Sequence, residues 1–383
     1  MIKILFIAHE TTRTGAPIAL LQLLKEFRQH YEDIGFELLY LRGGELLPAF
    51  EQLCPLHKGL NDYTIWNRIK KRILRGKTGR PYLSMFSKGQ FDVIYANTVV
   101  SFNVALELKR KLGIPVVGHV HESEAFMHSF SISKDDLKGI DAFISVSRLT
   151  SSCLINNYGV PSDKISIQYP ISAWVMDSLK NKDVVNEESF GNGHFLIGLF
   201  CNGSWYKSTE LIPVIMSAFY SKYPTANCRF VVIGRIPQEA VYHLRFDLRK
   251  LQLEDRIMFF GESDNPLSIV KRLNVLLLPS REESYSLVAQ EAAFMRTPIV
   301  GFKGATGAAE WISDKCGILV SYFDFPAMAD AIYSIYSDEA QRTRLGDQGC
   351  QVVEEMYKSN SEMDNVVHVL QNVTEKQILL KQH

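Results

Sequence analysis

The sequence has no excess of charge of either sign. Its 383 residues include 42 lysines and arginines and 42 aspartates and glutamates, so the formal net charge is zero. A chain balanced in this way has no bulk attraction to nucleic acid or to an acidic surface, and electrostatic recognition must come from local clusters. We therefore expect no nucleic-acid partner.

Long apolar runs and paired cysteines are missing as well. The longest runs, such as ILFIA and VLLLP, are far below the about 20 residues that span a bilayer. The opening residues, MIKILFIAHE, lack the length and the cleavage site of a signal peptide. The six cysteines are scattered without a CxxC pair, which favours reduced thiols. Together these absences predict a cytoplasmic protein.

Several metal-binding and catalytic motifs are also lacking. The chain contains no Asp-x-Asp pair for a divalent cation and no His and Cys cluster with zinc spacing. It contains no Walker loop, no complete GxGxxG and no Gly-x-Ser-x-Gly. We expect no metal and no cofactor, so side chains and helix-terminal amides would have to neutralise a bound phosphate.

What the chain does have is a regular alternation of short apolar runs with helix-length amphipathic segments. Continuous apolar strands separated by helices are typical of parallel sheets that are covered on both faces. The runs fall into two sets. The expected strands are 3–8, 36–41, 92–97, 115–121, 142–147 and 165–169 in the first set, and 195–201, 229–234, 256–261, 275–279, 298–302 and 317–320 in the second.

A polar stretch without strand periodicity, residues 175–193, separates the two sets. We therefore predict an α/β protein with two Rossmann-like, doubly wound parallel-sheet domains facing a cleft. The carboxyl ends of such strands are where ligands bind. The predicted ranges are a first domain at 1–175, a linker at 176–193, a second domain at 194–350, and C-terminal helices at 351–383 that pack back toward the first domain.

Two glutamates stand between two expected strands in SREESYSLVAQEAAFMRTPIVGF, residues 280–302. We place Glu283 in the loop after a strand and Glu291 inside the following helix. We expect the amides from Ser284 to Ser286 at that helix N-terminus, where backbone donors suit a phosphate. The carboxylates suit sugar hydroxyls and a ribose diol. The structural alternative is an acid that favours the helix dipole and a solvated helix residue.

The same stretch resembles the family 4 (group 1) glycosyltransferases, which are retaining enzymes of the GT-B fold. Their hallmark is a pair of glutamates separated by seven residues, after a strand that ends in Pro-Ser. Glu283 and Glu291 match the pair, and Pro279-Ser280 matches the strand end. GATGAAEWI and CGILV, further along, are similar to the family's glycine-rich loop and its G-x-L-V. The resemblance covers essentially the whole chain.

The resemblance also points to CNGSWYKSTELIPVIMSAF, residues 201–219. The family grips the donor diphosphate there with an arginine followed by a lysine. Lys207 matches the lysine, but no arginine precedes it. Backbone donors near Gly203, or Arg235, are the candidates to compensate. The structural alternative for Lys207 is a surface lysine at a helix start.

In the first domain, the resemblance places Gly15 in a loop near the donor phosphate, where glycine is expected to permit a tight turn. His121 matches a histidine that faces the sugar, and Glu122 follows it. His119 shares the strand face of His121, and either histidine could instead be a satisfied core residue. Arg148 is a candidate to contact the acceptor or a phosphate.

The resemblance implies retaining transfer of a sugar from a nucleotide-sugar donor to a glycan or lipid-linked acceptor, in cell-surface polysaccharide or glycolipid synthesis. The predicted catalytic residues are Glu283 and His121. The predicted donor-binding residues are Gly15, Gly203, Lys207, Ser284, Tyr285, Ser286 and Glu291, and the acceptor or phosphate candidates are Glu122 and Arg148. The alternatives are a sugar-nucleotide epimerase of the same fold and a non-catalytic sugar-nucleotide-binding protein.

A basic segment, WNRIKKRILRGKTGR at residues 66–80, is the one marked local charge asymmetry of the sequence. Its apolar residues recur at helical spacing, which predicts a short amphipathic helix. One interpretation is a solvated helix that packs on the first domain. The other is docking on an anionic inner-membrane surface, and the candidate residues for it are Lys70, Lys71, Arg72 and Arg75.

Overall fold

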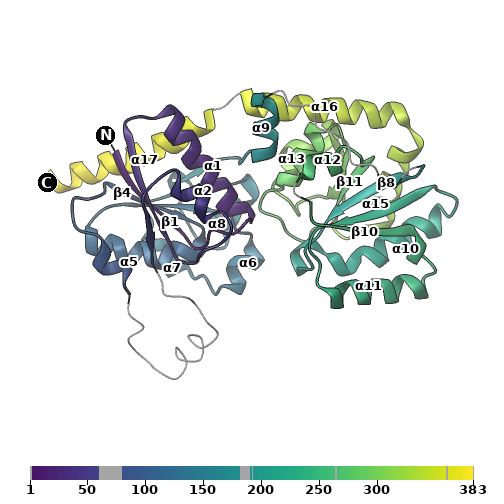
Figure 1. Ribbon diagram of the computed structural model, residues 1–383, viewed down its shortest axis with the longest axis horizontal. Coiled ribbons are helices and arrows are strands. Elements are labelled where there is room, and N and C mark those ends of the chain that lie inside the picture. Colours follow the sequence, from purple (N-terminus) through teal and green to yellow (C-terminus); the bar gives the residue numbers. More distant parts are fainter. Residues whose placement is uncertain are drawn as a thin grey trace, which may run out of the picture. The chain divides into compact units, whose positions relative to one another are not determined.

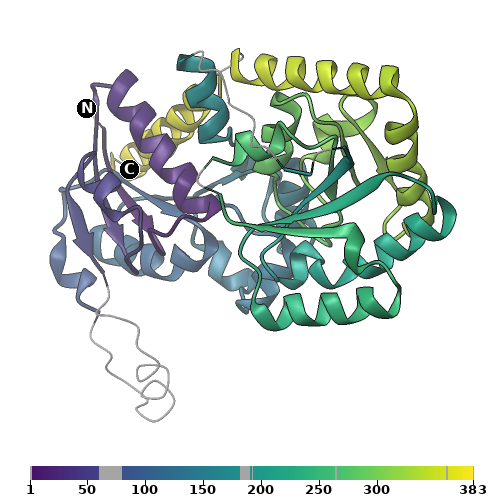
Figure 2. The ribbon, with the colours of Figure 1, turned by 45° about the vertical axis from the view of Figure 1, so that its right-hand side comes forward.

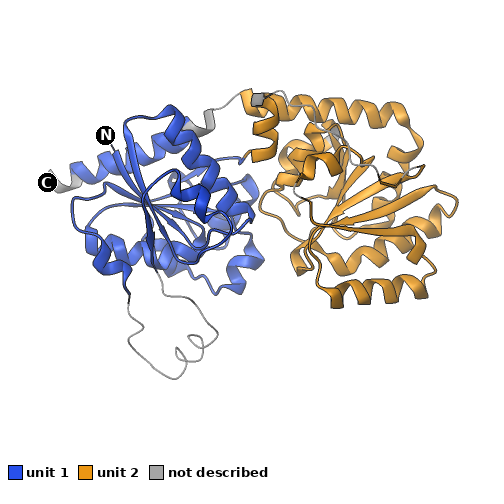
Figure 3. Cartoon of the chain, viewed as in Figure 1, with its two compact units in different colours: residues 1–170, 360–383 blue, residues 171–359 orange. Residues whose placement is uncertain are grey.

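The structure is a computed structural model, and it describes residues 2–59, 80–181, 190–191, 193–263, 265–358 and 361–382. The chain forms two compact units, which Figure 3 draws in different colours. Residues 1–170 and 360–383 make up unit 1, and residues 171–359 make up unit 2. Unit 1 is thus built from both ends of the chain.

Unit 1 contains a parallel sheet with the strand order β3-β2-β1-β4-β5-β6-β7, in which β1 pairs with β2 on one side and with β4 on the other. Its strands are β1 (Ile2–Ala8), β2 (Ile34–Tyr40), β3 (Leu56–Lys58), β4 (Val93–Asn97), β5 (Val116–Val120), β6 (Ala142–Ser145) and β7 (Ile165–Ile167). Its described helices are α1 (Gly15–His30), α2 (Leu47–Glu51), α4 (Tyr82–Met85), η1 (Val99–Ser101), α5 (Phe102–Leu112), α6 (Glu124–Ser129), α7 (Lys134–Lys138), α8 (Arg148–Asn156), η2 (Ser162–Lys164) and α17 (Ser361–Gln382).

Helices cover both faces of this sheet (Figure 1). Successive side chains of a strand point to opposite faces. Along β1, Ile4 and Phe6 therefore belong to a core shared with α1, α2 and α17, whereas Leu5 and Ile7 belong to a core shared with α5, α7 and α8. Such two-sided burial explains why the strand is a continuous apolar run.

Unit 2 contains a second parallel sheet, with the order β10-β9-β8-β11-β12-β13. Its strands are β8 (Phe195–Phe200), β9 (Cys228–Ile233), β10 (Ile257–Gly261), β11 (Val275–Leu278), β12 (Ile299–Phe302) and β13 (Gly317–Val320). Its described helices are α9 (Ala173–Asn181), η3 (Trp205–Lys207), η4 (Thr209–Leu211), α10 (Ile212–Lys222), α11 (Gln238–Lys250), η5 (Glu254–Arg256), α12 (Pro266–Val270), α13 (Leu287–Phe294), α14 (Ala309–Ile312), η6 (Ser313–Lys315), α15 (Phe325–Ser337) and α16 (Glu339–Lys358).

The unit 2 sheet also lies between two layers of helices (Figures 1 and 2). One face packs against α10, α11 and α15 through a core that includes Phe219, Phe230 and Phe302. The other face packs against α9, α12 and α13 through smaller residues, among them Ala289 and Ala292. Because these strands are parallel, the loops at the carboxyl ends of β8, β11, β12 and β13 lie together at one edge of the sheet.

The predicted fold class, two doubly wound parallel-sheet α/β domains, is confirmed, and each predicted strand overlaps an observed one. The prediction missed β3. This strand has three residues, and its register with β2 begins with the pair Leu38 and Leu56. An edge strand has one neighbour and is only partly buried, so LHK is not an apolar run.

The predicted domain ranges and the observed units divide the chain at different residues. The helix α9 spans the predicted limit at residue 175 and belongs to unit 2, where its Val175 is buried in the core. The helix α16 spans the predicted limit at residue 350 and also belongs to unit 2. The last helix, α17, lies against β4, β5 and β6 of unit 1. Within the described residues, none of the helices combines the length and the apolar character needed to cross a bilayer.

Candidate active site

Glu283 is held in place by main-chain hydrogen bonds. It lies in the loop between β11 and α13, as predicted, and forms an isolated parallel bridge with Thr306 in the loop after β12. Its N–H donates to the Ala305 carbonyl at 2.7 Å, and its own carbonyl accepts from the Gly307 N–H at 3.0 Å. These bonds fix the direction in which the side chain leaves the backbone.

The Glu283 carboxylate pairs with Lys207. The Lys207 ammonium donates to Glu283 Oε1 at 2.5 Å, and the Ser280 hydroxyl donates to Oε2 at 3.1 Å. The pair is largely shielded from solvent, since 26% of the Lys207 side chain and 12% of the Glu283 side chain are exposed. The fold thus brings together two charged residues that lie 76 positions apart in the sequence.

Arg281 locks the η3 turn that carries Lys207, and the sequence analysis missed it. The Arg281 N–H donates to the Tyr206 carbonyl at 2.8 Å. Its guanidinium donates to the Trp205 carbonyl at 2.9 Å and pairs with the Glu210 carboxylate. A planar fork of donors suits such multiple attachment better than a lysine ammonium does. Its position two residues before Glu283, in the same loop, is the signal that could have identified it.

Gly203, in the loop between β8 and η3, occupies a place that requires glycine. Its φ is +77°, and an added Cβ would lie 2.6 Å from Cδ of Pro237. Arg235, the side chain suggested as a substitute for the missing arginine, is exposed and lies 3.6 Å from the Glu262 carboxylate. Arg281, and not Arg235, is the arginine that lies against η3.

Two hydroxyls near the Lys207–Glu283 pair are buried without a hydrogen-bond partner. Ser286 is the N-cap residue of α13, yet its side chain caps no helix amide. Neither Ser286 Oγ nor Ser208 Oγ has a partner within the described part of the chain. A buried hydroxyl without a partner costs free energy that a water or a ligand can offset. Ser284, the residue after Glu283 in the same loop, is partly buried.

Glu291 lies inside α13, as predicted, but it is buried, so the alternative of a solvated helix residue is wrong. Its Oε1 accepts from the Ser172 hydroxyl at 2.7 Å. The Ser172 N–H donates to Gln290 Oε1 at 3.0 Å, and Gln290 Nε2 donates to the Tyr285 hydroxyl at 2.8 Å. Burial raises the pKa of Glu291 to about 7.

In unit 1, His119 and His121 lie on the same face at the end of β5, as strand alternation predicts, with ring centroids 3.9 Å apart. The Tyr95 hydroxyl lies 2.6 Å from His119 Nδ1, and Asn97 Oδ1 lies 2.9 Å from His121 Nε2. Burial lowers the pKa of His121 to about 3 and the pKa of His119 well below its ordinary value. Both imidazoles are therefore neutral at neutral pH.

The Glu122 side chain is buried inside unit 1. Its Oε2 accepts from the backbone N–H groups of Val99 at 3.2 Å and of His121 at 3.0 Å, and burial raises the pKa of Glu122 to about 7. The carboxylate thus supports the turns that follow β4 and β5. Arg148, by contrast, is exposed at the first position of α8. Its predicted contact with acceptor or phosphate stays a prediction.

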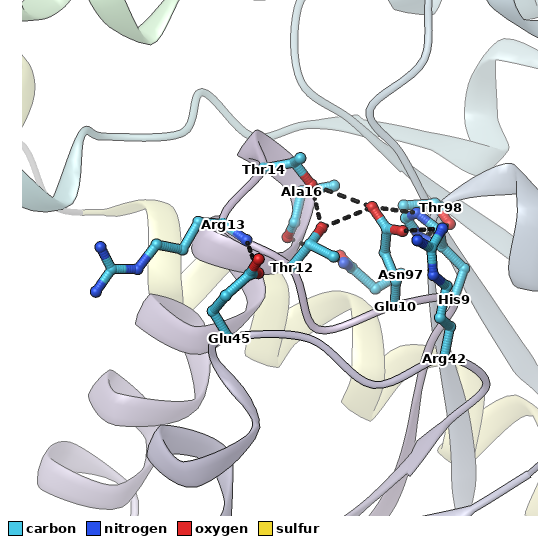
Figure 4. A network of polar contacts seen from close by, with 10 residues as sticks. All are labelled: His9, Glu10, Thr12, Arg13, Thr14, Ala16, Arg42, Glu45, Asn97 and Thr98. Atoms are coloured by element: carbon cyan, nitrogen blue, oxygen red, sulfur yellow. Dashed lines mark hydrogen bonds and ion pairs between the residues drawn. The ribbon is translucent and has the colours of Figure 1, made fainter. Parts of the chain in front are cut away.

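A polar network at the carboxyl end of β1 contains side chains that the sequence analysis did not assign to a site (Figure 4). Glu10 Oε1 accepts from the hydroxyls of Thr12 at 2.8 Å and Thr14 at 3.4 Å. His9 Nε2 lies 3.5 Å from the same oxygen, and Arg42 Nη1 lies 3.5 Å from Oε2. Neighbours from two loops therefore orient this carboxylate, which lies where a doubly wound sheet binds ligands.

The network is anchored to a strained residue. Thr98, directly after β4, has a φ of +101°, which is rare for a β-branched side chain. Its hydroxyl lies 3.0 Å from His9 Nδ1 (Figure 4), and its N–H donates to the His119 carbonyl at 2.9 Å. Backbone strain of about 1–3 kcal/mol persists only where the surroundings fix it, and it clusters at functional sites.

Gly15 differs from its expectation. It is the exposed first residue of α1 and has no positive φ, and an added Cβ would meet no atom within 4 Å. The structure shows no tight turn at Gly15, because the backbone begins a helix there. Its predicted place near the donor phosphate stays a prediction. Gly44 is the glycine of this region that a larger residue cannot replace without a clash, since a Cβ there would lie 2.6 Å from the main chain of Thr11.

Two further predictions concern charged clusters. The membrane-docking candidates Lys70, Lys71, Arg72 and Arg75 lie outside the described residues. In the described part of the chain, no group of three or more His, Cys, Asp or Glu side chains is placed to hold a metal ion.

Each unit matches a known protein family. Residues 15–170 match Glycosyltransferase Family 4, and residues 198–338 match Glycosyl transferases group 1. The chain belongs to the family 4 (group 1) glycosyltransferases. The first match contains His121, and the second contains the Lys207–Glu283 pair.

Named relatives of this chain are distant. The D-inositol 3-phosphate glycosyltransferase of Pseudarthrobacter chlorophenolicus is 21% identical over 274 residues, which are 67% of this chain and 65% of that protein. The capsular polysaccharide biosynthesis glycosyltransferase CapM of Staphylococcus aureus is 25% identical over 169 residues, which are 44% of this chain and 43% of that protein. The chain thus spans less than two thirds of the length of either relative.

The similarity to solved structures extends over the whole chain. Anabaena HepE, solved in complex with UDP-glucose, matches this chain with a TM-score of 0.71 and 18% identity, over 98% of this chain and 99% of that one. Identity at this level shows the fold, and the GT-B fold predicted from the sequence is confirmed.

Proposed function

We propose that this protein is a retaining glycosyltransferase that moves a sugar from a nucleotide-sugar donor to a glycan or lipid-linked acceptor, in the synthesis of a cell-surface polysaccharide or glycolipid. The observation that carries the proposal is the Lys207–Glu283 pair, with the partnerless hydroxyls of Ser208 and Ser286 within three residues of it in the sequence. A sugar diphosphate requires these groups: a cation and donors for its phosphates, and a carboxylate for its sugar.

On the donor side, the Lys207 ammonium exchanges Glu283 for the diphosphate, because a charge-assisted bond to phosphate replaces the ion pair. The hydroxyls of Ser208 and Ser286 and the free amides at the start of α13 donate to the remaining phosphate oxygens. Glu283 then accepts from the donor sugar and faces the positive charge that develops at the anomeric carbon. The second carboxylate oxygen of Glu291 accepts from the ribose.

Retention follows if the acceptor hydroxyl attacks from the face that the diphosphate leaves. The bond from the anomeric carbon to the diphosphate oxygen breaks, the bond to the acceptor oxygen forms on the same face, and the departing phosphate oxygen takes the acceptor proton. This sequence needs no carboxylate nucleophile. His121 is neutral, because burial lowers its pKa to about 3, so it can hydrogen-bond the sugar without adding positive charge beside the developing cation.

The relatives suggest which substrates to test first. HepE was solved with UDP-glucose, and CapM is named for capsular polysaccharide biosynthesis. We therefore propose UDP-sugars as the first donors and a polysaccharide or its lipid-linked precursor as the first acceptor for this chain.

Thermal unfolding with UDP-, GDP-, ADP- and dTDP-sugars tests the donor site. A nucleotide that binds only the folded protein stabilises it by ~2.7 kcal/mol at ~100 times its Kd. We expect sugars of one nucleotide to stabilise the wild type, and no stabilisation by any of them would contradict the proposal. Product analysis separates the alternatives, because a transferase releases the nucleoside diphosphate and an epimerase does not.

The proposal includes peripheral association with an anionic membrane through the basic segment at 66–80, and this part rests on the sequence alone. Binding to anionic vesicles that falls with added salt supports it. The matched variant changes Lys70, Lys71, Arg72 and Arg75 to Gln. Equal partitioning of wild type and variant at low salt contradicts it.

A further inference from the structure

Three exposed aromatic side chains gather at the carboxyl ends of the unit 2 strands. Trp205 follows β8 and is 55% exposed, and Tyr322 and Phe323 follow β13 and are 49% and 39% exposed. The Arg281 guanidinium lies 4.9 Å from the centre of the Trp205 ring and 5.6 Å from the centre of the Phe323 ring. It thus joins rings from two loops into one surface, which we call the aromatic ledge (Trp205, Tyr322 and Phe323).

Phe323 has an unfavourable backbone conformation. Its φ is +60°, a left-handed conformation that glycine and asparagine adopt readily and a bulky side chain rarely does. Its ring lies 4.4 Å from that of Tyr322, with the two planes 23° apart. Phe323 also stacks on Phe325, with ring centroids 5.5 Å apart and the planes 27° apart. The strained backbone therefore holds Phe323 in an aromatic stack that supports the exposed Tyr322 ring.

The chemistry of the ledge suits a sugar ring. The Arg281 charge is balanced by its ion pair with Glu210, so the ledge presents apolar ring faces with a neutral polar edge. A pyranose has an apolar face of C–H groups, which the electron-rich face of an aromatic ring attracts, and a rim of hydroxyls that a guanidinium and a carboxylate can bind. An anionic or a purely apolar ligand would match only one part of this surface.

The ledge also lies away from the expected nucleoside site. Tyr322 and Phe323 pack on Phe302, which belongs to the core beneath α10 and α15. Glu291, the proposed ribose ligand, lies on α13, which covers the opposite face of the sheet. Trp205 is nevertheless in the same turn as Lys207, so the ledge borders the place where the sugar would be transferred.

We propose that the aromatic ledge is a saccharide-binding subsite that holds the glycan part of the acceptor by stacking on Trp205 and Tyr322, with Phe323 as the support of the Tyr322 ring. Its place in the reaction rests on the proposed glycosyltransferase function, whereas its ability to bind a saccharide does not. The acceptor class that follows is a neutral oligosaccharide or polysaccharide chain, and not an isolated small alcohol.

Binding of the full-length protein to an array of immobilised neutral oligosaccharides tests the subsite. We expect the wild type to bind a subset of them and Trp205→Ala and Tyr322→Ala to bind about fivefold to tenfold more weakly, as for the loss of one stacking ring. The Tm of each variant, measured alongside, separates loss of folding from loss of binding. Tyr242→Ala, which removes an equally exposed ring of α11, is the matched control and should bind like the wild type.

The outcomes separate the inference from the function on which it rests. A wild type that binds none of the oligosaccharides, or ledge variants that bind them as tightly as the wild type, would overturn the subsite. Ledge variants that lose UDP-induced stabilisation instead of saccharide binding would show a nucleobase platform and would also overturn it. Saccharide binding that depends on the ledge, together with no stabilisation by any nucleotide sugar, would support the subsite and contradict the proposed function.

Discussion

Ser172 and Glu291, 119 residues apart in the sequence, share a hydrogen bond of 2.7 Å in the interior of unit 2. Ser172 belongs to the segment with which the chain enters unit 2. Glu291 is therefore both the candidate ribose ligand and the anchor of that segment. Its burial raises its pKa to about 7, so both roles depend on a carboxyl group that titrates near neutrality.

The first prediction concerns stability against pH. An acid whose pKa is higher in the folded state, here about 7 against an ordinary 4.5, contributes stability that is complete below the lower value and is lost as the pH rises through the higher one. Glu291→Gln removes this loss. The free energy of unfolding of the variant minus that of the wild type should therefore be more positive at about pH 8 than at about pH 5, by on the order of 2 kcal/mol.

Urea unfolding of both proteins at the two pH values measures this difference. Glu122, whose pKa burial also raises to about 7, is present in both proteins, so its contribution cancels. The same difference in unfolding free energy at both pH values would contradict the prediction.

The second prediction concerns Glu283→Gln. The main-chain bonds of Glu283 with Ala305 and Gly307 remain in this variant, so the protein should stay folded. Turnover should fall by about 10²–10³-fold, since the carboxylate faces charge that develops in the transition state. Transfer rates with a verified donor and acceptor, together with the Tm, measure both effects. Glu282→Gln in the same loop is the control, and near wild-type turnover of Glu283→Gln would refute the assignment.

The third prediction concerns Lys207→Ala. Loss of one charge-assisted bond should weaken binding of the nucleoside diphosphate by about 10–100-fold and leave binding of the free nucleoside nearly unchanged. Calorimetric titration with both ligands separates the two effects. Lys303→Ala, at an exposed lysine of the same unit, is the matched control. An equal loss for nucleoside and diphosphate would place Lys207 outside the phosphate site.

The fourth prediction concerns Arg281→Lys. Lysine keeps the charge but lacks the planar fork that contacts Trp205, Glu210 and the Phe323 ring. The η3 turn should loosen, and the KM for the donor should rise by about tenfold with a smaller change in kcat. Steady-state kinetics over a range of donor concentrations measure the two constants. A fall in kcat alone would show that Arg281 does not act through the Lys207 turn.

The fifth prediction concerns metal removal. If Lys207, the hydroxyls and the α13 amides meet the diphosphate charge, EDTA should leave the transfer rate of the wild type unchanged within about twofold. Added Mg²⁺ should have an equally small effect. Activity that EDTA abolishes and a divalent ion restores would contradict the metal-free proposal.

The sequence predicted the features that depend on local pattern. The alternating apolar runs located the strands, and strand alternation placed His119 and His121 on one face. The loop position of Glu283 and the helix position of Glu291 followed from the same pattern.

The rest depends on contacts between segments that are distant in the sequence. The Lys207–Glu283 pair joins residues 76 positions apart, and Arg281 reaches Glu210 across 71 positions. The strain at Thr98, with its φ of +101°, leaves no local signal, because its bonds to His9 and His119 join residues that are distant in the sequence. Gly15 is the opposite case. The sequence suggested a special backbone role for this glycine, but the backbone there does not require glycine.

The return of α17 to unit 1 has a consequence for synthesis. Buried residues of this helix, Val366, Val369, Leu370 and Val373, complete a core whose other members lie before residue 171. The 189 residues of unit 2, 171 to 359, are translated in between, which takes roughly 10–40 s at about 5–20 residues per second. Unit 2 can therefore fold before unit 1 receives its last helix, and until then, of the described helices, only α1 and α2 cover that face of the unit 1 sheet.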